Sequence, residues 1–150
     1  YEYKCNYESF IFSTISNFLG QGKKIYLFSF CKNEGDEDVI NYYLNKFSDK
    51  NIEGVNYSGN IDIFLDKFSR METIVGTRFH SIVLALVFKQ KLMAISYSDK
   101  TNNMLESVGY KGHILDIQNL GEISNIDSFI NYDTSLNNNI FSDAIKQFTK

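Results

Sequence analysis

The chain has 150 residues, of which 43% are hydrophobic and 22% are charged, and its formal net charge is -3 at pH 7. This length fits one domain with a sizeable core, and the composition excludes a disordered chain. The acidic balance disfavours a general nucleic-acid binder, and the longest apolar run, Ile82 to Phe88, is far shorter than the roughly 20 residues of a membrane span.

Residue spacing in the first half of the chain alternates between helical and strand patterns. Apolar side chains at helical spacing predict helices, and short apolar runs rich in β-formers predict strands. In chain order we expect a helix, a buried strand, a helix, a weaker strand and a helix, over Glu8 to Leu19, Lys24 to Phe30, Asp36 or Glu37 to Phe47, Ile52 to Tyr57 and Asn60 to Arg70.

The second half continues the same alternation. We expect strands over Thr73 to Gly76, Leu92 to Tyr97 and His113 to Ile117, and helices over Ser81 to Phe88, Lys100 to Val108, Ile123 to Asn131 and Asn138 to Phe148. Strands that alternate with helices imply right-handed βαβ crossovers and a parallel sheet. The fold class is therefore α/β, a Rossmann-like doubly wound parallel sheet, with residues 1–150 as a single domain.

The two cysteines give little chemistry. Cys5 and Cys31 form no Cys-x-x-Cys pair, which favours free thiols in a reducing cytosol over a disulfide or a zinc site. The acidic cluster of Glu34, Asp36, Glu37 and Asp38 is more typical of a solvated helix start than of a metal site.

The turn after the third strand combines groups that bind anions and move protons. The segment from Gly76 to Ser81 leads directly into an apolar helix, whose N-terminus presents unpaired N–H groups and a partial positive charge. Arg78 adds a planar fork that matches a carboxylate or a phosphate, and His80 adds a side chain that exchanges protons near neutral pH. Two structural alternatives remain: Arg78 could pair with an acidic residue, and His80 could cap the helix or donate to a carbonyl.

The turn after the fourth strand is equally ambiguous. It reads Tyr97-Ser98-Asp99-Lys100. Asp99 could N-cap the next helix, and Lys100 could reach an anion or extend into water. For His113, at the start of the fifth strand, we expect a structural or solvated role.

The stretch from Ile74 to Tyr110 resembles the C-terminal half of the polysaccharide pyruvyltransferase family. In that family a Gly-x-Arg-x-His segment precedes an apolar helix, and a strand ending in Tyr is followed by a Lys. Gly76, Arg78, His80, Tyr97 and Lys100 occupy those places. This chain departs from the family pattern before the fourth strand, where Lys89-Gln90-Lys91 replaces the usual Gly-x-Pro, and at Phe79, where the family commonly has Leu.

The resemblance implies a bacterial enzyme of surface-polysaccharide synthesis that transfers pyruvate from phosphoenolpyruvate to a sugar as a cyclic ketal. It implies two Rossmann-like domains in a GT-B arrangement, with the active site between them. This chain, which begins with Tyr1 and not Met, would be the C-terminal half and nearly inactive alone. The partners implied are phosphoenolpyruvate, a free or lipid-linked saccharide acceptor, and the N-terminal domain of the full-length protein. The expected location is the cytoplasm, peripheral to the inner face of the membrane.

The same resemblance assigns roles to individual residues. Arg78 and the helix N-terminus would hold the donor, and His80 would contact it and pass protons. The further substrate-binding residues would be Phe79, Ser81, Tyr97 and Lys100. The scheme requires neither a metal nor an organic cofactor. Two alternatives stay open: a GT-B glycosyltransferase that binds a nucleotide sugar through Asp99, and a non-catalytic anion-binding module.

Overall fold

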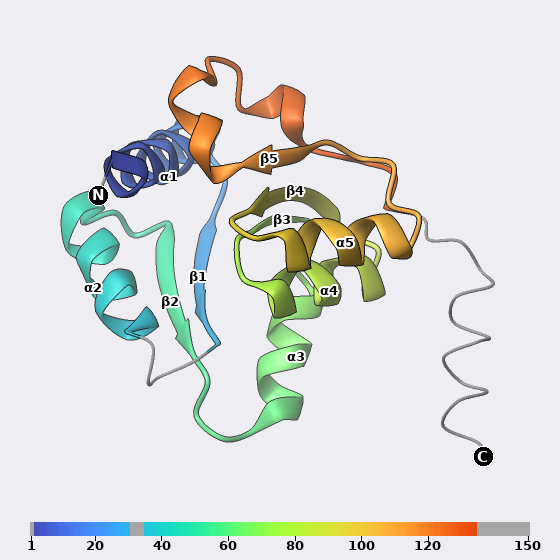
Figure 1. Ribbon diagram of the computed structural model, residues 1–150. Helices are drawn as coiled ribbons and strands as arrows, with labels where there is room; N and C mark the ends of the chain where they lie inside the picture. The colour runs from blue at the N-terminus through green and yellow to red at the C-terminus, as the bar shows by residue number, and fades with distance from the viewer. Residues whose placement is uncertain (1, 31–34, 135–150) are drawn as a thin grey trace. The chain divides into compact units, whose positions relative to one another are not determined.

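The structure is a computed structural model that describes residues 2–30 and 35–134 (Figure 1). Contacts along the chain divide it into two compact units, Tyr1–Arg70 and Met71–Lys150. Each unit has a parallel sheet of its own.

The first unit is built on a two-stranded parallel sheet. Its elements are α1 (Glu2–Gly20), β1 (Ile25–Ser29), α2 (Asp36–Phe47), β2 (Ile52–Asn56) and α3 (Ile61–Ser69). The register of β1 and β2 runs from Ile25↔Ile52 to Ser29↔Asn56. Ile15 of α1, Tyr43 of α2 and Ile52 form a buried cluster, so both helices contribute to the core of this sheet.

Side-chain hydrogen bonds and aromatic contacts position α2 and α3. The carboxylate of Asp36, the first residue of α2, accepts a hydrogen bond from the Phe30 amide at 3.1 Å. Asn60 is the N-cap of α3, because its side chain accepts from the Ile63 amide at 3.2 Å. Phe64 and Phe68 of α3 then pack edge-on against the rings of β1 and the residue after it, with centroids 5.1 to 5.8 Å apart.

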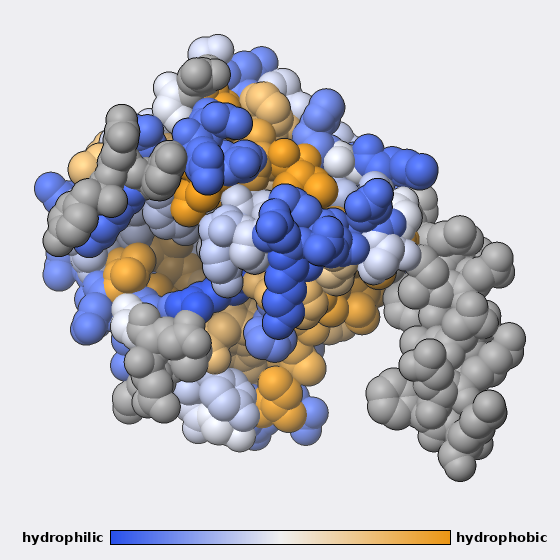
Figure 2. All heavy atoms as spheres, viewed as in Figure 1, coloured by the Kyte–Doolittle hydropathy of each residue, from blue (hydrophilic) through white to orange (hydrophobic). Residues whose placement is uncertain are grey.

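The second unit is built on a three-stranded parallel sheet with the order β3-β4-β5. Its elements are β3 (Thr73–Gly76), α4 (Phe79–Val87), β4 (Lys91–Ser96), α5 (Asp99–Ser107), β5 (Ile114–Asp116) and the 3-10 segments η2 (Ile117–Glu122) and η3 (Asp127–Phe129). Leu92 to Ser96 of the central strand are all buried, whereas the outer surface of α5 is hydrophilic (Figure 2). β4 is therefore the centre of this unit's core.

The α/β fold class and its parallel strands are confirmed, and ten of the expected elements are present with small shifts at their ends. α1 begins earlier than predicted, at Glu2, and a Lys4–Glu8 ion pair of 3.8 Å links neighbouring turns of this extension. The strands form two sheets, β1-β2 and β3-β4-β5.

The helix predicted over Ile123 to Asn131 is wrong. The chain there has only the short 3-10 segment η3, and Asn131 instead forms an antiparallel bridge with Leu92. The Leu92 amide donates to the Asn131 carbonyl at 3.0 Å, and the Asn131 amide donates to the Leu92 carbonyl at 2.8 Å. β5 pairs with β4 only from Ala94 onward, so Asn131 satisfies the backbone groups that β5 does not reach.

Three further expectations concern single segments. The helix predicted over Asn138 to Phe148 lies outside the described residues, as does Cys31. Cys5 is a free and exposed thiol. Within the described residues, no helix combines the length and the apolar character needed to cross a membrane.

Candidate functional site

The two turns singled out in the sequence meet at the carboxyl edge of the second unit's sheet. β3 and β4 are parallel neighbours, with Gly76 in register with Ala94. The loops that follow them therefore leave the sheet on the same edge, which is where ligands bind in parallel α/β sheets. A side-chain contact joins the turns, because Lys100 Nζ lies over the Phe79 ring, 5.0 Å from its centroid.

Gly76 permits α4 to begin immediately beyond the end of β3. A Cβ atom at this position would lie 2.8 Å from Ile82 Cγ1 and 3.2 Å from Ser81 Oγ. Both distances are shorter than ordinary van der Waals contact between these atoms. A glycine at the strand end thus brings the first turn of the helix against the strand.

The start of α4 is arranged as an anion site would require. Arg78 is the N-cap residue, with extended backbone (φ -82°, ψ 138°), and its carbonyl accepts from the Ile82 amide at 3.2 Å. The first-turn amides, which include those of Phe79, His80 and Ser81, have no partner within the helix. The first turn holds no acidic residue, so the partial positive charge of the helix end is not neutralised from within.

The predicted site residues at α4 differ in exposure. His80 is exposed, and its ring meets the Phe79 ring edge-on with centroids 5.9 Å apart. Arg78 and Phe79 are half-buried. Ser81 is buried and its hydroxyl donates to the Arg78 carbonyl at 2.7 Å, so this hydroxyl holds the helix start in place.

The second turn brings an exposed ring and a cation to the same edge. Tyr97 is 56% exposed, and Lys100 is exposed apart from its contact with Phe79. The N-cap of α5 is Ser98, so of the alternatives left open for Asp99 the capping role does not occur; Asp99 lies in the first turn. Ser96 shapes the turn, since its hydroxyl donates to the Ser98 carbonyl at 3.0 Å.

The departure from the family pattern before β4 lies at the opposite, amino edge of the sheet. Lys89 has a left-handed backbone with φ 55°, a conformation that glycine adopts at no steric cost. Gln90 is buried and its side-chain amide donates to the Met71 carbonyl at 2.7 Å. The turn lies at the amino edge of the sheet and does not adjoin the Arg78 segment, which follows the carboxyl end of β3.

Sequence reasoning missed polar residues beyond the third strand of this sheet. Asp116 was predicted inside a longer strand, but β5 ends at this residue, in register with Ser96. Asn125 and Ser128 were predicted on a helix that does not form. The run of Gly, Ser and Asn residues between Gly121 and Ser128 is typical of a loop and was the available signal.

Comparison with known proteins gives one positive finding for this chain. The family model described as Polysaccharide pyruvyl transferase matches residues 2–99. The match includes Arg78, His80 and Tyr97 and ends one residue before Lys100. No curated protein and no solved structure matches the chain.

Proposed function

Because the chain belongs to the polysaccharide pyruvyl transferase family, we propose that it transfers pyruvate from phosphoenolpyruvate to a saccharide in the synthesis of a bacterial surface polysaccharide. The observation that supports the proposal is that Arg78 and His80 belong to the start of α4, where Lys100 Nζ lies over the Phe79 ring of the same turn. Phosphoenolpyruvate carries a carboxylate and a phosphate, and this helix end is the kind of site that holds such groups.

The atoms and charges of the proposed reaction balance when the protein contributes only charged groups and proton transfer. A proton adds to the methylene carbon of the donor, which leaves a cationic centre on the adjacent carbon. One sugar hydroxyl adds to this carbon and loses its proton, and phosphate then departs. A second hydroxyl adds at the same carbon and loses its proton. The products are a cyclic pyruvate ketal and inorganic phosphate, which takes up the remaining proton.

Arg78 is the proposed anchor for the donor. Its guanidinium presents parallel N–H donors that fit a carboxylate or phosphate in two-point contact. The first-turn amides of α4 supply further donors at the same end of the helix. The buried Ser81 hydroxyl fixes the Arg78 carbonyl, so the backbone from which the anchor extends is held by the helix itself.

His80 and Lys100 complete the proposed arrangement. His80 is exposed at the helix start, where it can deliver a proton to the donor and accept one from a sugar hydroxyl. Lys100 lies over the Phe79 ring, so the ring orients a cation toward the same helix end. This cation would compensate the charge of the departing phosphate.

A titration with phosphoenolpyruvate, followed by amide chemical shifts, tests the proposal. We expect shifts to cluster from Thr77 to Leu84 and to disappear in Arg78→Ala. The matched control is Arg70→Ala, because Arg70 is the other arginine of the chain and forms an exposed ion pair with Asp66 at 3.0 Å. Shifts that persist in Arg78→Ala, or that are lost equally in Arg70→Ala, would overturn the donor site. Shifts from Tyr97 to Lys100 with a nucleotide sugar, and none with phosphoenolpyruvate, would favour glycosyl transfer instead.

A further inference from the structure

An open surface cavity of about 530 Å³ lies beside β5, in the part of the chain beyond the family match. Its volume is within the roughly 300 to 1,000 Å³ of small-molecule sites. The cavity is formed by β5, by η2 and by the segment that leads into η3.

The lining mixes polar side chains, all but one of them uncharged, with the apolar side chains of Ile114, Leu115, Ile123 and Phe129. The residues that matter here are Asp116, Asn119, Ser124, Asn125, Ser128 and Phe129. They combine a carboxylate, two amides and two hydroxyls with one ring. Amides and hydroxyls both donate and accept hydrogen bonds, and a carboxylate accepts them, which is the complement that a polyhydroxylated ring needs.

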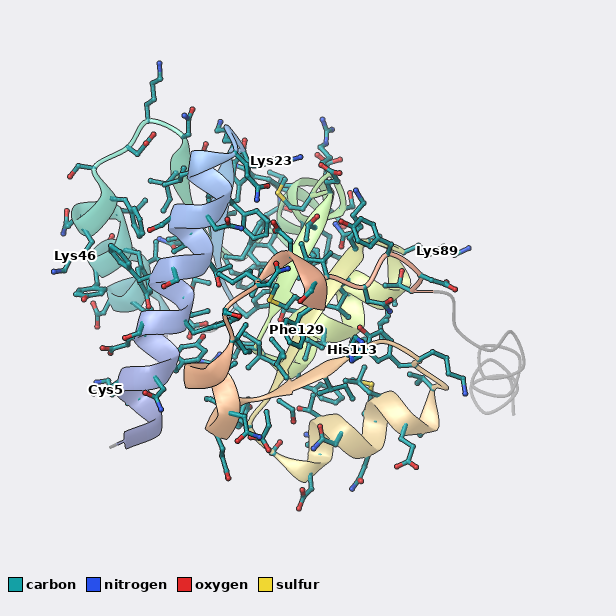
Figure 3. The ribbon with its side chains drawn as sticks, turned by 90° about the horizontal axis from the view of Figure 1, so that it is seen from above. Cys5, Lys23, Lys46, Lys89, His113 and Phe129 are labelled. Atoms are coloured by element: carbon teal, nitrogen blue, oxygen red, sulfur yellow. The ribbon has the colours of Figure 1, made fainter. Side chains whose placement is uncertain are left out.

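Among the described residues that line this cavity, none is a lysine or an arginine. An anionic ligand would meet the Asp116 carboxylate with no compensating cation, so the cavity disfavours phosphates and carboxylates. The Phe129 ring offers an electron-rich face to C–H groups. Its edge-on contact with His113, at a centroid distance of 6.1 Å, helps to hold the ring at the cavity (Figure 3). Neutral, hydroxyl-rich and partly apolar ligands fit these conditions, and a hexopyranose is all three.

Local hydrogen bonds hold two of the polar side chains, those of Asp116 and Ser128, in place before any ligand arrives. Asp116 Oδ1 accepts from the Gln118 amide at 2.8 Å, which fixes the carboxylate at the end of β5. The Ser128 hydroxyl donates to the Asn125 carbonyl at 2.7 Å, which closes the loop on the other side. Preorganised donors and acceptors reduce the entropy lost on binding.

The position of the cavity along the sheet relates it to the donor site. Asp116 is in register with Ser96, and Ser96 directly precedes the Tyr97 turn. Neighbouring strands are about 4.8 Å apart, so the end of β5 lies roughly 10 Å along the sheet edge from the end of β3. This separation leaves room for a donor at α4 and a sugar ring beside it on one edge of the sheet.

We propose that the cavity beside β5 binds the acceptor sugar, as a neutral hexopyranose. The role of this sugar as the acceptor rests on the proposed function, whereas the binding of a sugar in the cavity rests on the lining residues alone. The proposal assigns acceptor recognition to a segment outside the family match.

The test is a titration of the 150-residue chain with methyl β-D-galactopyranoside, methyl β-D-glucopyranoside and methyl α-D-mannopyranoside, followed by amide chemical shifts. Xylitol is the control for non-specific polyol effects, and glucuronate is the control for charge. Asn125→Ala removes one amide of the lining, and Asp116→Asn removes the charge but keeps the acceptor that caps η2. The matched control variant is Asn103→Ala, on the exposed surface of α5.

We expect at least one glycoside to shift amides from Ile114 to Phe129, with Asn125→Ala weakening its dissociation constant by about fivefold and Asn103→Ala leaving it unchanged. Xylitol shifts of equal size, or tighter binding of glucuronate, would overturn the sugar site. Phosphoenolpyruvate is titrated into the same samples. Donor shifts near Arg78 without any glycoside shifts would refute the acceptor site and leave the proposed function intact. Glycoside shifts without donor shifts would remove the acceptor role along with the proposed function.

Discussion

Replacing Gly76 with alanine tests whether the close approach of α4 to β3 builds the site. The added Cβ would lie 2.8 Å from Ile82 Cγ1, whereas carbon atoms in contact are normally about 3.5 to 4.0 Å apart. Ile82 is 0% exposed, so the atoms packed around it resist any shift of its side chain. The helix start must therefore move away from the strand end, at a cost of about 1 to 3 kcal/mol in the free energy of unfolding.

Chemical denaturation measures this cost, and a phosphoenolpyruvate titration of the same variant measures its effect on the site. We expect Gly76→Ala to lower the unfolding free energy and to weaken donor binding, because the first-turn amides move with Arg78. Gly20→Ala is the control, since a Cβ there meets no atom within 4 Å and should change the unfolding free energy by less than about 1 kcal/mol.

A double variant separates a steric clash from any other effect of the alanine. Ile82→Ala removes the Cγ1 atom that the new Cβ would meet, and leaves a cavity of its own. The combined variant should then be more stable than the sum of the two losses predicts, by about 0.5 to 3 kcal/mol. Strict additivity, or a Gly76→Ala protein as stable as Gly20→Ala with unchanged donor binding, would refute the reasoning.

Four further changes have defined outcomes. Phe79→Leu keeps an apolar side chain but removes the ring beneath Lys100, and should weaken phosphoenolpyruvate binding about twofold to fivefold by calorimetry, whereas Phe88→Leu should not. Gly112→Ala should lower the midpoint of chemical denaturation strongly, because its Cβ would overlap the Tyr110 hydroxyl and the Asn131 amide; a wild-type midpoint would contradict this packing. Lys89→Gly should raise the unfolding free energy by about 1 kcal/mol, as it relieves the left-handed backbone at φ 55°, and a loss would contradict that account. The hydrogen bond from Lys67 lowers the pKa of Glu53 below its usual 4.5, so this pair stabilises the fold above that pH and the benefit is lost as the pH falls through the lowered pKa. Glu53→Gln should therefore be slightly less stable than the wild type in denaturation at neutral pH, and a difference that persists in strong acid would refute the assignment.

The sequence was sufficient to predict helices and strands that have a clear hydrophobic periodicity or a clear terminating residue. The apolar run of β4 and the helical spacing of α2 predicted both elements almost to the residue. Boundaries were less certain where caps decide them. α4 begins at Phe79 and not at Ser81, because the Arg78 carbonyl accepts both the Ile82 amide and the Ser81 hydroxyl, and no spacing of apolar residues encodes that.

Tertiary pairing explains the predictions that were wrong. The apolar residues from Ile123 to Ile130 have spacing that fits a helix, but the segment ends in the antiparallel bridge between Asn131 and Leu92. Local sequence does not reveal that Leu92 needs a pairing partner, because this need arises from the short length of β5. The division of the strands into two sheets is equally non-local.

The candidate site was predictable in its composition but not in its contacts. Arg78 and His80 were identified from their place before an apolar helix, whereas the Lys100–Phe79 contact required the register of β3 and β4. The roles of Ser81 and Ser96 in holding the two turns also became clear only from the structure. The GT-B arrangement with a further domain stays a prediction.

The dissociation constant of phosphoenolpyruvate for the wild type, Arg78→Ala and Arg70→Ala, measured by calorimetry, tests the central claim most directly. A charge-assisted two-point contact contributes about 1.5 to 3 kcal/mol, so Arg78→Ala should bind roughly tenfold to a hundredfold more weakly. Arg70→Ala should bind as the wild type does, and equal denaturation midpoints would show that both variants are folded. Equal affinities of the two variants would contradict a donor site at the start of α4.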